Sequence, residues 1–239
     1  MTTRFFTIGD IHGCARELER LLAALPLGAG DTVAFVGDYI DRGLESRAVV
    51  DLLLDFERRA GITAVFLKGN HEDMCLGYLG RGGAWGEAWC LNGGAATLRS
   101  YGIDAPARGD EVASRMPPEH LAFLDRLQTA YFADGHLVVH AGVRPDVGWD
   151  EQDEQDLLWI REEFILQPHR LPQTVVFGHT PQRTVYVDLP YKIGIDTGCV
   201  YGGMLTALEL RERRLWQVRL GDARVQEAGM AVSGVRRFA

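Results

Sequence analysis

Short apolar runs alternate with amphipathic segments over the first third of the chain. Residues 4–8, 33–36 and 62–67 are mostly apolar and predict three strands. Residues 14–25 and 44–60 carry apolar side chains at helical spacing, and each ends near a glycine or proline. Strands that alternate with helices in this rhythm predict a parallel sheet with helical crossovers.

A polar turn follows each of these three strands. The turns are Gly9-Asp10-Ile11-His12-Gly13, then Gly37-Asp38-Tyr39-Ile40-Asp41-Arg42-Gly43, and then Lys68-Gly69-Asn70-His71-Glu72. In parallel α/β sheets, ligands bind beyond the carboxyl ends of the strands, where all three turns are expected. Two carboxylates and a guanidinium after a buried strand are costly unless they meet a cation and an anion. Taken alone, the second turn also fits an ordinary surface turn with an internal Asp–Arg pair.

Two later strands are predicted to end in the same way. Residues 131–133 and 137–140 predict a hairpin whose second strand ends at His140, and residues 174–177 predict a strand that ends before His179. A single histidine is more often structural, and we expect this of His120, His136 and His169. Oxygen and imidazole donors from five strand ends are harder to explain by packing, and they predict a site for divalent metal. The six donors are Asp10, His12, Asp38, Asn70, His140 and His179.

The remaining segments predict an insertion and a second sheet. Residues 73–131 are rich in glycine and tryptophan and then helical over about 118–127, which indicates a helical subdomain that overhangs the site. Trp85 and Trp89, at helical spacing, are expected in its core. Strands near 184–187, 192–195, 205–210 and 215–220 are expected to form antiparallel hairpins in the second sheet. Residues after 221 show little pattern, and we expect them to be loosely held.

Length and composition limit the kind of protein. The chain has 239 residues, 46% of them apolar, which favours a single domain over residues 1–239 with one sizeable core. A formal charge of −8 argues against duplex nucleic acid or an anionic membrane as partner. No targeting segment and no run of membrane-spanning length is visible in the sequence. The widely spaced Cys14, Cys75, Cys90 and Cys199 suit reduced thiols in a cytoplasmic protein.

The series of motifs resembles the phosphoprotein phosphatase family of metallophosphoesterases. The matching segments are the turns after residues 8, 36 and 67, together with His140-Ala141-Gly142, Gly178-His179 and Asp196-Thr197-Gly198. They follow the family's order. Leu91-Asn92-Gly93-Gly94 and Trp159-Ile160-Arg161 are similar to segments of the small bacterial and lambda-phage protein phosphatases.

The resemblance implies an α/β fold, a four-layer α/β/β/α sandwich, and a dinuclear metal centre. The ions are expected to be manganese, or iron with manganese or zinc. By position, Asp10, His12 and Asp38 hold the first ion, and Asn70, His140 and His179 hold the second, with Asp38 bridging the two. Such a pair of ions activates a shared water as hydroxide and clamps the phosphate.

The resemblance also implies roles for four side chains around the metals. Arg42 and Arg161 would grip phosphoryl oxygens, because guanidinium matches their geometry. His71 would donate a proton to the leaving oxygen. Asp41 would orient His71 and keep it protonated, since a nearby carboxylate raises a histidine pKa.

Three functions follow from this resemblance and from the residues. The leading hypothesis is a metal-dependent phosphomonoesterase that acts on phosphoserine or phosphothreonine in proteins. The alternative is a symmetrical bis(5'-nucleosyl)-tetraphosphatase, which hydrolyses diadenosine tetraphosphate with the same motifs and whose bacterial members tend to extend further at the C-terminal end. A non-catalytic metal scaffold explains the chain poorly, because it gives His71, Asp41 and Arg42 no purpose. The physiological substrate, the native metal pair and the oligomeric state stay open.

Overall fold

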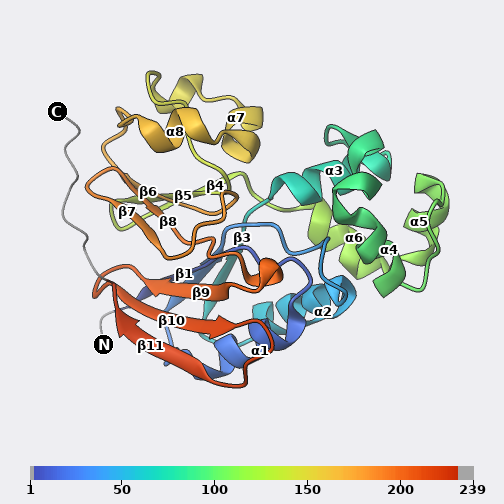
Figure 1. The fold of residues 1–239 in the computed structure, drawn as a ribbon, viewed down its shortest axis with the longest axis horizontal. Helices are drawn as coiled ribbons and strands as arrows, with labels where there is room; N and C mark the ends of the chain where they lie inside the picture. Colours follow the sequence, from blue (N-terminus) through green and yellow to red (C-terminus); the bar gives the residue numbers. More distant parts are fainter. Residues whose placement is uncertain (1–2, 231–239) are drawn as a thin grey trace.

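The fold is built on two β-sheets that pack face to face (Figure 1). The structure is a computed structural model, and it describes residues 3–230. The six-stranded sheet has the order β11-β10-β9-β1-β2-β3, and the five-stranded sheet has the order β4-β5-β6-β8-β7. The strands of the first sheet are β1 (Phe5–Ile8), β2 (Thr32–Phe35), β3 (Thr63–Phe66), β9 (Met204–Glu209), β10 (Arg214–Arg219) and β11 (Val225–Gly229). Those of the second are β4 (Ala130–Ala133), β5 (His136–Val139), β6 (Thr174–Phe177), β7 (Tyr186–Asp188) and β8 (Lys192–Gly194).

Helices lie outside both sheets and beside them. In Figure 1, α7 (Glu154–Trp159) and α8 (Glu162–Leu166) lie above the second sheet. The helices α1 (Ala15–Ala24) and α2 (Ser46–Glu57) pack on the outer face of the first sheet. The inserted helices stand together to one side. They are α3 (Asn70–Tyr78), α4 (Ala95–Ser100), α5 (Gly109–Arg115) and α6 (Pro118–Asp125), with the short turns η1 (Gly86–Ala88) and η2 (Cys90–Gly94). Two further short turns are η3 (Trp149–Glu151) and η4 (Cys199–Tyr201).

Alternating side chains on the strands build three separate cores. On β2, Val33 and Phe35 face the core under α1 and α2, while Ala34 faces the core between the sheets. On β5, Val138 faces the core between the sheets, and Val139 faces the core under α7 and α8. Three cores separate four layers. The predicted α/β/β/α sandwich is therefore confirmed.

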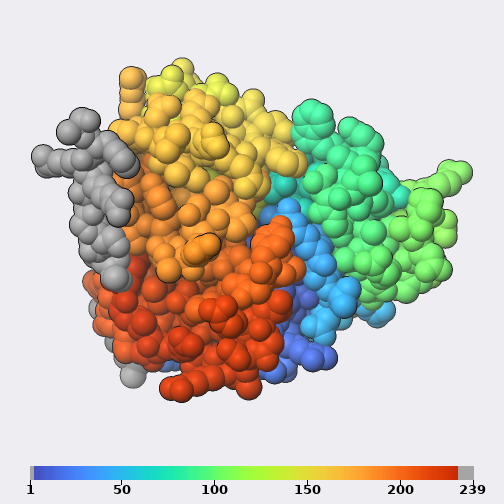
Figure 2. Space-filling view, in the orientation of Figure 1, coloured from blue at the N-terminus to red at the C-terminus, as the bar shows by residue number. Residues whose placement is uncertain are grey.

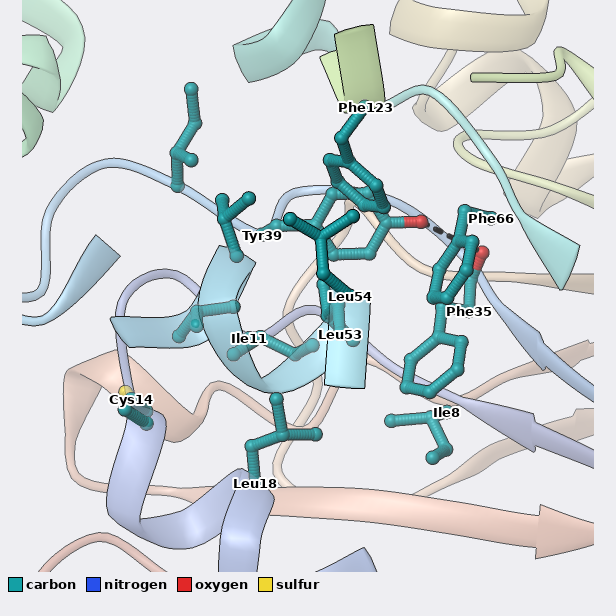
Figure 3. Packing of buried hydrophobic residues seen from close by; sticks show 14 of the residues in the cluster. Ile8, Ile11, Cys14, Leu18, Phe35, Tyr39, Leu53, Leu54, Phe66 and Phe123 are labelled. Atoms are coloured by element: carbon teal, nitrogen blue, oxygen red, sulfur yellow. Dashed lines mark hydrogen bonds between the residues drawn. The ribbon is translucent and has the colours of Figure 1, made fainter. Parts of the chain in front are cut away.

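Aromatic packing anchors the loop that follows β2. The Tyr39 hydroxyl donates to the Leu67 carbonyl at 2.7 Å and also lies 3.3 Å from the Phe35 carbonyl. Its ring packs edge-on against Phe123 of α6, which in turn contacts Phe66 (Figure 3). Because these rings are buried, they hold both the loop and the inserted helices against the first sheet.

The C-terminal strands correct two expectations. Only β7 and β8 enter the second sheet, whereas β9 pairs antiparallel with β1 in the first sheet, so that Thr7 lies opposite Leu208. The segment after residue 221 is also more ordered than expected over the described range, because β11 pairs with β10 along five residues. Residues 231–239 lie outside the described residues.

The two inserted tryptophans have different surroundings. Trp89 is fully buried, as expected, but the side chain of Trp85 is 57% exposed. The expectation of a core role is therefore wrong for Trp85. The reason is geometric: Trp85 occupies a left-handed turn before η1, which turns its ring outward from the helix that follows.

Candidate metal and phosphate site

Five loops meet at one edge of the two sheets, after β1, β2, β3, β5 and β6. Several residues in these loops have a left-handed backbone conformation, which residues other than glycine rarely adopt. Among residues 3–230, eight non-glycine residues have positive φ, and five of them lie in these loops: His12 (45°), Asp38 (54°), Asp41 (74°), Arg42 (67°) and His179 (62°). Such strain concentrates at functional sites, where the surrounding structure must hold it.

Asp38 lies at the centre of the site. Its carboxylate is 3.3 Å from His12 Nε2 and 3.4 Å from His140 Nε2. Possible metal-ligand atoms of His12 and His71 lie within 4.8 Å of it, and so do those of His140 and His179. One carboxylate thus belongs to two clusters, which suits a bridging ligand.

The histidine tautomers suit a cation at this site. Nδ1 of His12 donates to the Ile40 carbonyl, and Nδ1 of His140 donates to the Val36 carbonyl, each at 2.9 Å. In the neutral ring, Nε2 then carries a lone pair, and in both residues it faces the Asp38 carboxylate. Two acceptors face each other stably only with a cation or a proton between them; at His12 the guanidinium of Arg42 also contacts Nε2. Backbone bonds of this kind commonly orient metal-binding histidines.

A second group of donors converges beside the first. Asn70 Oδ1 lies 3.0 Å from both His140 Nε2 and His179 Nδ1. His179 Nε2 is buried and has no hydrogen-bond partner among the described residues. Burial, followed by the neighbouring His140, brings the pKa of His179 well below its usual value. A neutral imidazole whose Nδ1 faces Asn70 and His140 is suited to bind metal through that nitrogen.

Asp10 adds a further buried carboxylate. Burial raises its pKa well above the usual value, and Asp196 and Asp38 raise it further. Burial also raises the pKa of Asp196 to about 6. The backbone N–H of His179 donates to Asp10 at 2.9 Å, and a Cβ on Gly178 would come within 2.0 Å of the same carboxylate. This crowding of acids, imidazoles and an amide oxygen fits borderline divalent ions such as manganese, iron or zinc.

Glu72 has a role in the site that was not predicted from the sequence. Its carboxylate accepts from the backbone N–H groups of Asp38 and Gly69, at 2.8 and 2.9 Å, and from those of Tyr39 and Ile40, at 2.8 and 3.2 Å. It therefore fixes the backbone on both sides of the central carboxylate. A glutamate three residues after a helix N-cap is a usual N-terminal cap signal, and it could have indicated this position.

His71 and Asp41 form a buried pair at the edge of the first cluster. His71 Nδ1 lies 2.6 Å from Asp41 Oδ2. Trp89 Nε1 donates to Asp41 at 2.9 Å, and the Thr97 hydroxyl donates to it at 2.6 Å. The inserted helices therefore hold the carboxylate that orients His71, a role for Trp89 and Thr97 that sequence reasoning missed.

The two predicted phosphate-binding arginines differ in position. The guanidinium of Arg42 contacts His12 Nε2 and lies 5.6 Å from the ring centre of Tyr201. Arg161 is exposed, and its side chain makes no hydrogen bond or ion pair within residues 3–230. Its charge contributes, after burial and His140, to the lowered pKa of His179. Arg144 pairs instead with Asp156 at 2.5 Å.

The structure thus brings the six predicted ligands to one edge and leaves His120, His136 and His169 elsewhere. His120 is buried between Tyr101 and Asp51, with its nitrogens 2.8 and 3.0 Å from their side chains. His169 Nε2 lies 2.7 Å from the Tyr191 carbonyl, and His136 Nδ1 lies 2.9 Å from the Asp134 carbonyl. Across residues 3–230, every helix is too short or too polar to cross a membrane.

Several known proteins are similar to this chain over most of its length. The serine/threonine-protein phosphatase 1 of Salmonella typhimurium is 30% identical, covering 86% of this chain and 91% of that protein. The asymmetrical bis(5'-nucleosyl)-tetraphosphatase PrpE of Anoxybacillus flavithermus is 29% identical, covering 86% and 89%. A crystal structure described as a putative diadenosine tetraphosphatase superposes with a TM-score of 0.69 at 28% identity, covering 92% of this chain and 95% of its own.

The family profile named Calcineurin-like phosphoesterase matches residues 3–212, which include every loop of the site. The chain therefore belongs to the calcineurin-like metallophosphoesterases and is an enzyme of that class.

Proposed function

We propose that the chain is a metal-dependent phosphomonoesterase that hydrolyses phosphoserine or phosphothreonine in proteins. The observation that carries this proposal is the buried pair of His71 and Asp41, 2.6 Å apart, beside the metal-ligand clusters. A serine or threonine side chain leaves as a strongly basic alkoxide, so its departure benefits from a positioned proton donor. A leaving group that is already a stable anion needs such a donor far less.

In this proposal, Asp10, His12 and Asp38 hold one divalent ion, and Asn70, His140 and His179 hold another, with Asp38 shared. When bound, the ions would activate a water at neutral pH and neutralise charge on the phosphoryl group. We take manganese as the first candidate, because the donor set mixes imidazole with oxygen.

The remaining side chains of the site would bind the phosphate and handle its proton. Arg42 is fixed between His12 and the Tyr201 ring, where its planar guanidinium can bind two phosphoryl oxygens. Arg161, at the start of α8, has no ion pair within residues 3–230, and its charge contributes to the lowered pKa of the nearby His179. Together they would stabilise the charge that develops on the phosphoryl oxygens.

His71 would act through its second nitrogen. Asp41 would accept from Nδ1 and orient the ring, which leaves Nε2 to donate to the leaving oxygen. Trp89 and Thr97 keep Asp41 in place from the inserted helices. Because His71 and Asp41 are almost fully buried, bulk water does not replace either partner.

A second candidate is hydrolysis of dinucleoside tetraphosphates. It is favoured by the similarity to the Anoxybacillus flavithermus tetraphosphatase and to the structure described as a putative diadenosine tetraphosphatase. The leaving group would then be a nucleotide phosphate, which is much less basic than an alkoxide. In this reaction the buried pair of His71 and Asp41 would therefore contribute little to the rate.

Turnover of two substrates by one preparation tests the proposal. The enzyme, loaded with manganese, is assayed on a phosphoserine peptide and on diadenosine tetraphosphate, and kcat/KM is compared. We expect the phosphopeptide to be the better substrate. A clear preference for diadenosine tetraphosphate would overturn the assignment in favour of the second candidate.

A further inference from the structure

A groove of about 440 Å³ opens beside the metal site, on the side of the C-terminal hairpin. The loop after β6 forms one wall of the groove. The other wall is formed by η4 and the adjacent ends of β9 and β10. The lining residues are Pro181, Gln182, Arg183, Thr197, Gly198, Tyr201, Gly202, Gly203, Met204 and Arg219. In Figure 2 the orange segment near residue 200 borders the blue loops of the N-terminal third.

The groove carries positive charge that nearby acids do not neutralise. Arg183 and Arg219 both line it and are exposed, and its lining contains no acidic side chain. Within residues 3–230, neither guanidinium forms an ion pair, although Arg219 donates to the Gly202 carbonyl at 2.9 Å. By contrast, most exposed arginines that border the inserted helices are paired, as Arg81 is with Asp125 and Arg126 with Glu57.

The groove is continuous with the place where the scissile phosphate must bind. Tyr201 lines it, and the guanidinium of Arg42 lies 5.6 Å from the centre of the same ring. Thr197 and Gly198 directly follow Asp196, and Pro181 is two residues beyond His179. A substrate held by Arg42 could therefore extend over Tyr201 into the groove.

We propose that this groove binds a second anionic group of the substrate, through Arg183 and Arg219. Guanidinium groups bind carboxylates and phosphates bidentately, which makes two unpaired ones a recognition site for anions. The inference rests on the proposed function, under which the anions are acidic side chains that flank the phosphorylated residue. The distal phosphates of a dinucleoside polyphosphate have the same chemistry and are the other possible source.

The test is a discrimination ratio measured on matched peptides. One phosphoserine peptide carries glutamates on both sides of the phosphoserine, and its counterpart carries glutamines at the same positions. The ratio of kcat/KM, acidic over neutral, should exceed one for the native enzyme at low salt. In the Arg183→Gln, Arg219→Gln double variant it should fall about 2- to 30-fold, the range expected for losing two exposed ion pairs.

Three comparisons make the ratio specific to the groove. Arg211→Gln lies at the opposite end of the β9–β10 hairpin and should leave the ratio unchanged. Arg183→Lys with Arg219→Lys keeps the charges and should retain part of the ratio. For the native enzyme, about 0.5 M salt should bring the ratio towards one, because exposed charges are screened at that ionic strength.

The outcomes distinguish a failure of the groove proposal from a failure of the proposed function. A native ratio of one, or a ratio that the double variant leaves unchanged, would overturn the groove while phosphopeptide turnover still supports the function. If the enzyme turns over p-nitrophenyl phosphate but no phosphopeptide, the protein-phosphatase proposal fails. The groove is then tested by the ratio of diadenosine tetraphosphate to p-nitrophenyl phosphate: a fall in the double variant supports it with phosphate as the anion, and no change overturns it.

Discussion

Asp41 shows how much a single side chain can connect. Its backbone is left-handed, and its N–H lies 2.9 Å from the Thr97 hydroxyl and 3.1 Å from that of Ser46. Its carboxylate accepts from Trp89 and Thr97 while it binds His71. The motif predicted that Asp41 and His71 act together. It could not predict Trp89 or Thr97, because their contact depends on how the insertion docks.

Replacing His71 by asparagine should affect substrates according to the basicity of the leaving group. Turnover of a phosphopeptide should fall by about 10²–10⁴-fold, the usual contribution of a positioned acid. Turnover of p-nitrophenyl phosphate should fall distinctly less, since nitrophenolate leaves without a proton. Steady-state rates on both substrates are measured at equal metal content. Asp41→Asn should show the same pattern more weakly, and equal losses on both substrates would refute the proton-donor role.

Replacing Trp89 by phenylalanine should weaken the pair of His71 and Asp41 while an aromatic side chain still fills part of the core. A smaller phenyl ring takes the place of the indole, and the indole N–H that donates to Asp41 at 2.9 Å is lost; a hydrogen bond to a charged group contributes about 1.5–3 kcal/mol. We expect a lower melting temperature and a loss on phosphopeptide that exceeds the loss on p-nitrophenyl phosphate. Trp85→Phe is the matched control, because Trp85 is exposed and donates to Gln155 instead. Similar effects of both changes would contradict this role.

At the scale of elements, the apolar pattern predicted what local sequence determines. The strands β1, β2 and β3 and the helices α1 and α2 follow from residues that are near each other in the chain. The sheet to which β9 belongs does not, since its partner β1 lies about 200 residues earlier. Likewise, β11 shows no alternation of buried and exposed side chains and is held by main-chain pairing to β10. Such a strand leaves almost no signal in a sequence.

An ion pair fixes the start of β1 to the loop before β2, and it should make stability depend on pH. Asp31 accepts from Arg4 Nη2 at 2.7 Å and from the backbone N–H groups of Arg4 and Gly28. Although burial opposes ionisation, these bonds bring the pKa of Asp31 below its usual value. A depressed carboxyl pKa stabilises the fold above the unfolded value, about 3.9, and this stabilisation is lost as pH falls through the folded pKa.

Asp31→Asn should therefore lower the free energy of unfolding by about 1.5–3 kcal/mol at pH 7. The difference from the native protein should shrink as pH falls below about 3.9, where the native carboxyl also becomes protonated. Urea unfolding of both proteins at pH 7, 5 and 3 measures it. A difference that stays constant down to pH 3 would show that the charge of Asp31 is not the cause.

At the scale of the whole molecule, two sheets that pack face to face bring five strand ends to one edge. The sequence predicted the ligands Asp10, His12, Asp38, Asn70, His140 and His179 because each follows an apolar strand that ends in a polar turn. Their metal roles stay predictions, and so does the division of the chain into one domain with an insertion. What surrounds the site was less predictable: the Tyr201 ring near Arg42 and the groove beside it arise where distant segments meet.

We propose that Asp38 is shared by two metal ions held at this edge. The most direct test is the metal content of the purified enzyme after chelation and reloading with manganese, for the native protein and for Asp38→Asn. The native chain should bind two ions. Asp38→Asn should lose at least one of them and most of its activity, although asparagine keeps the size of the side chain. Two fully retained ions and normal activity in Asp38→Asn would contradict the account.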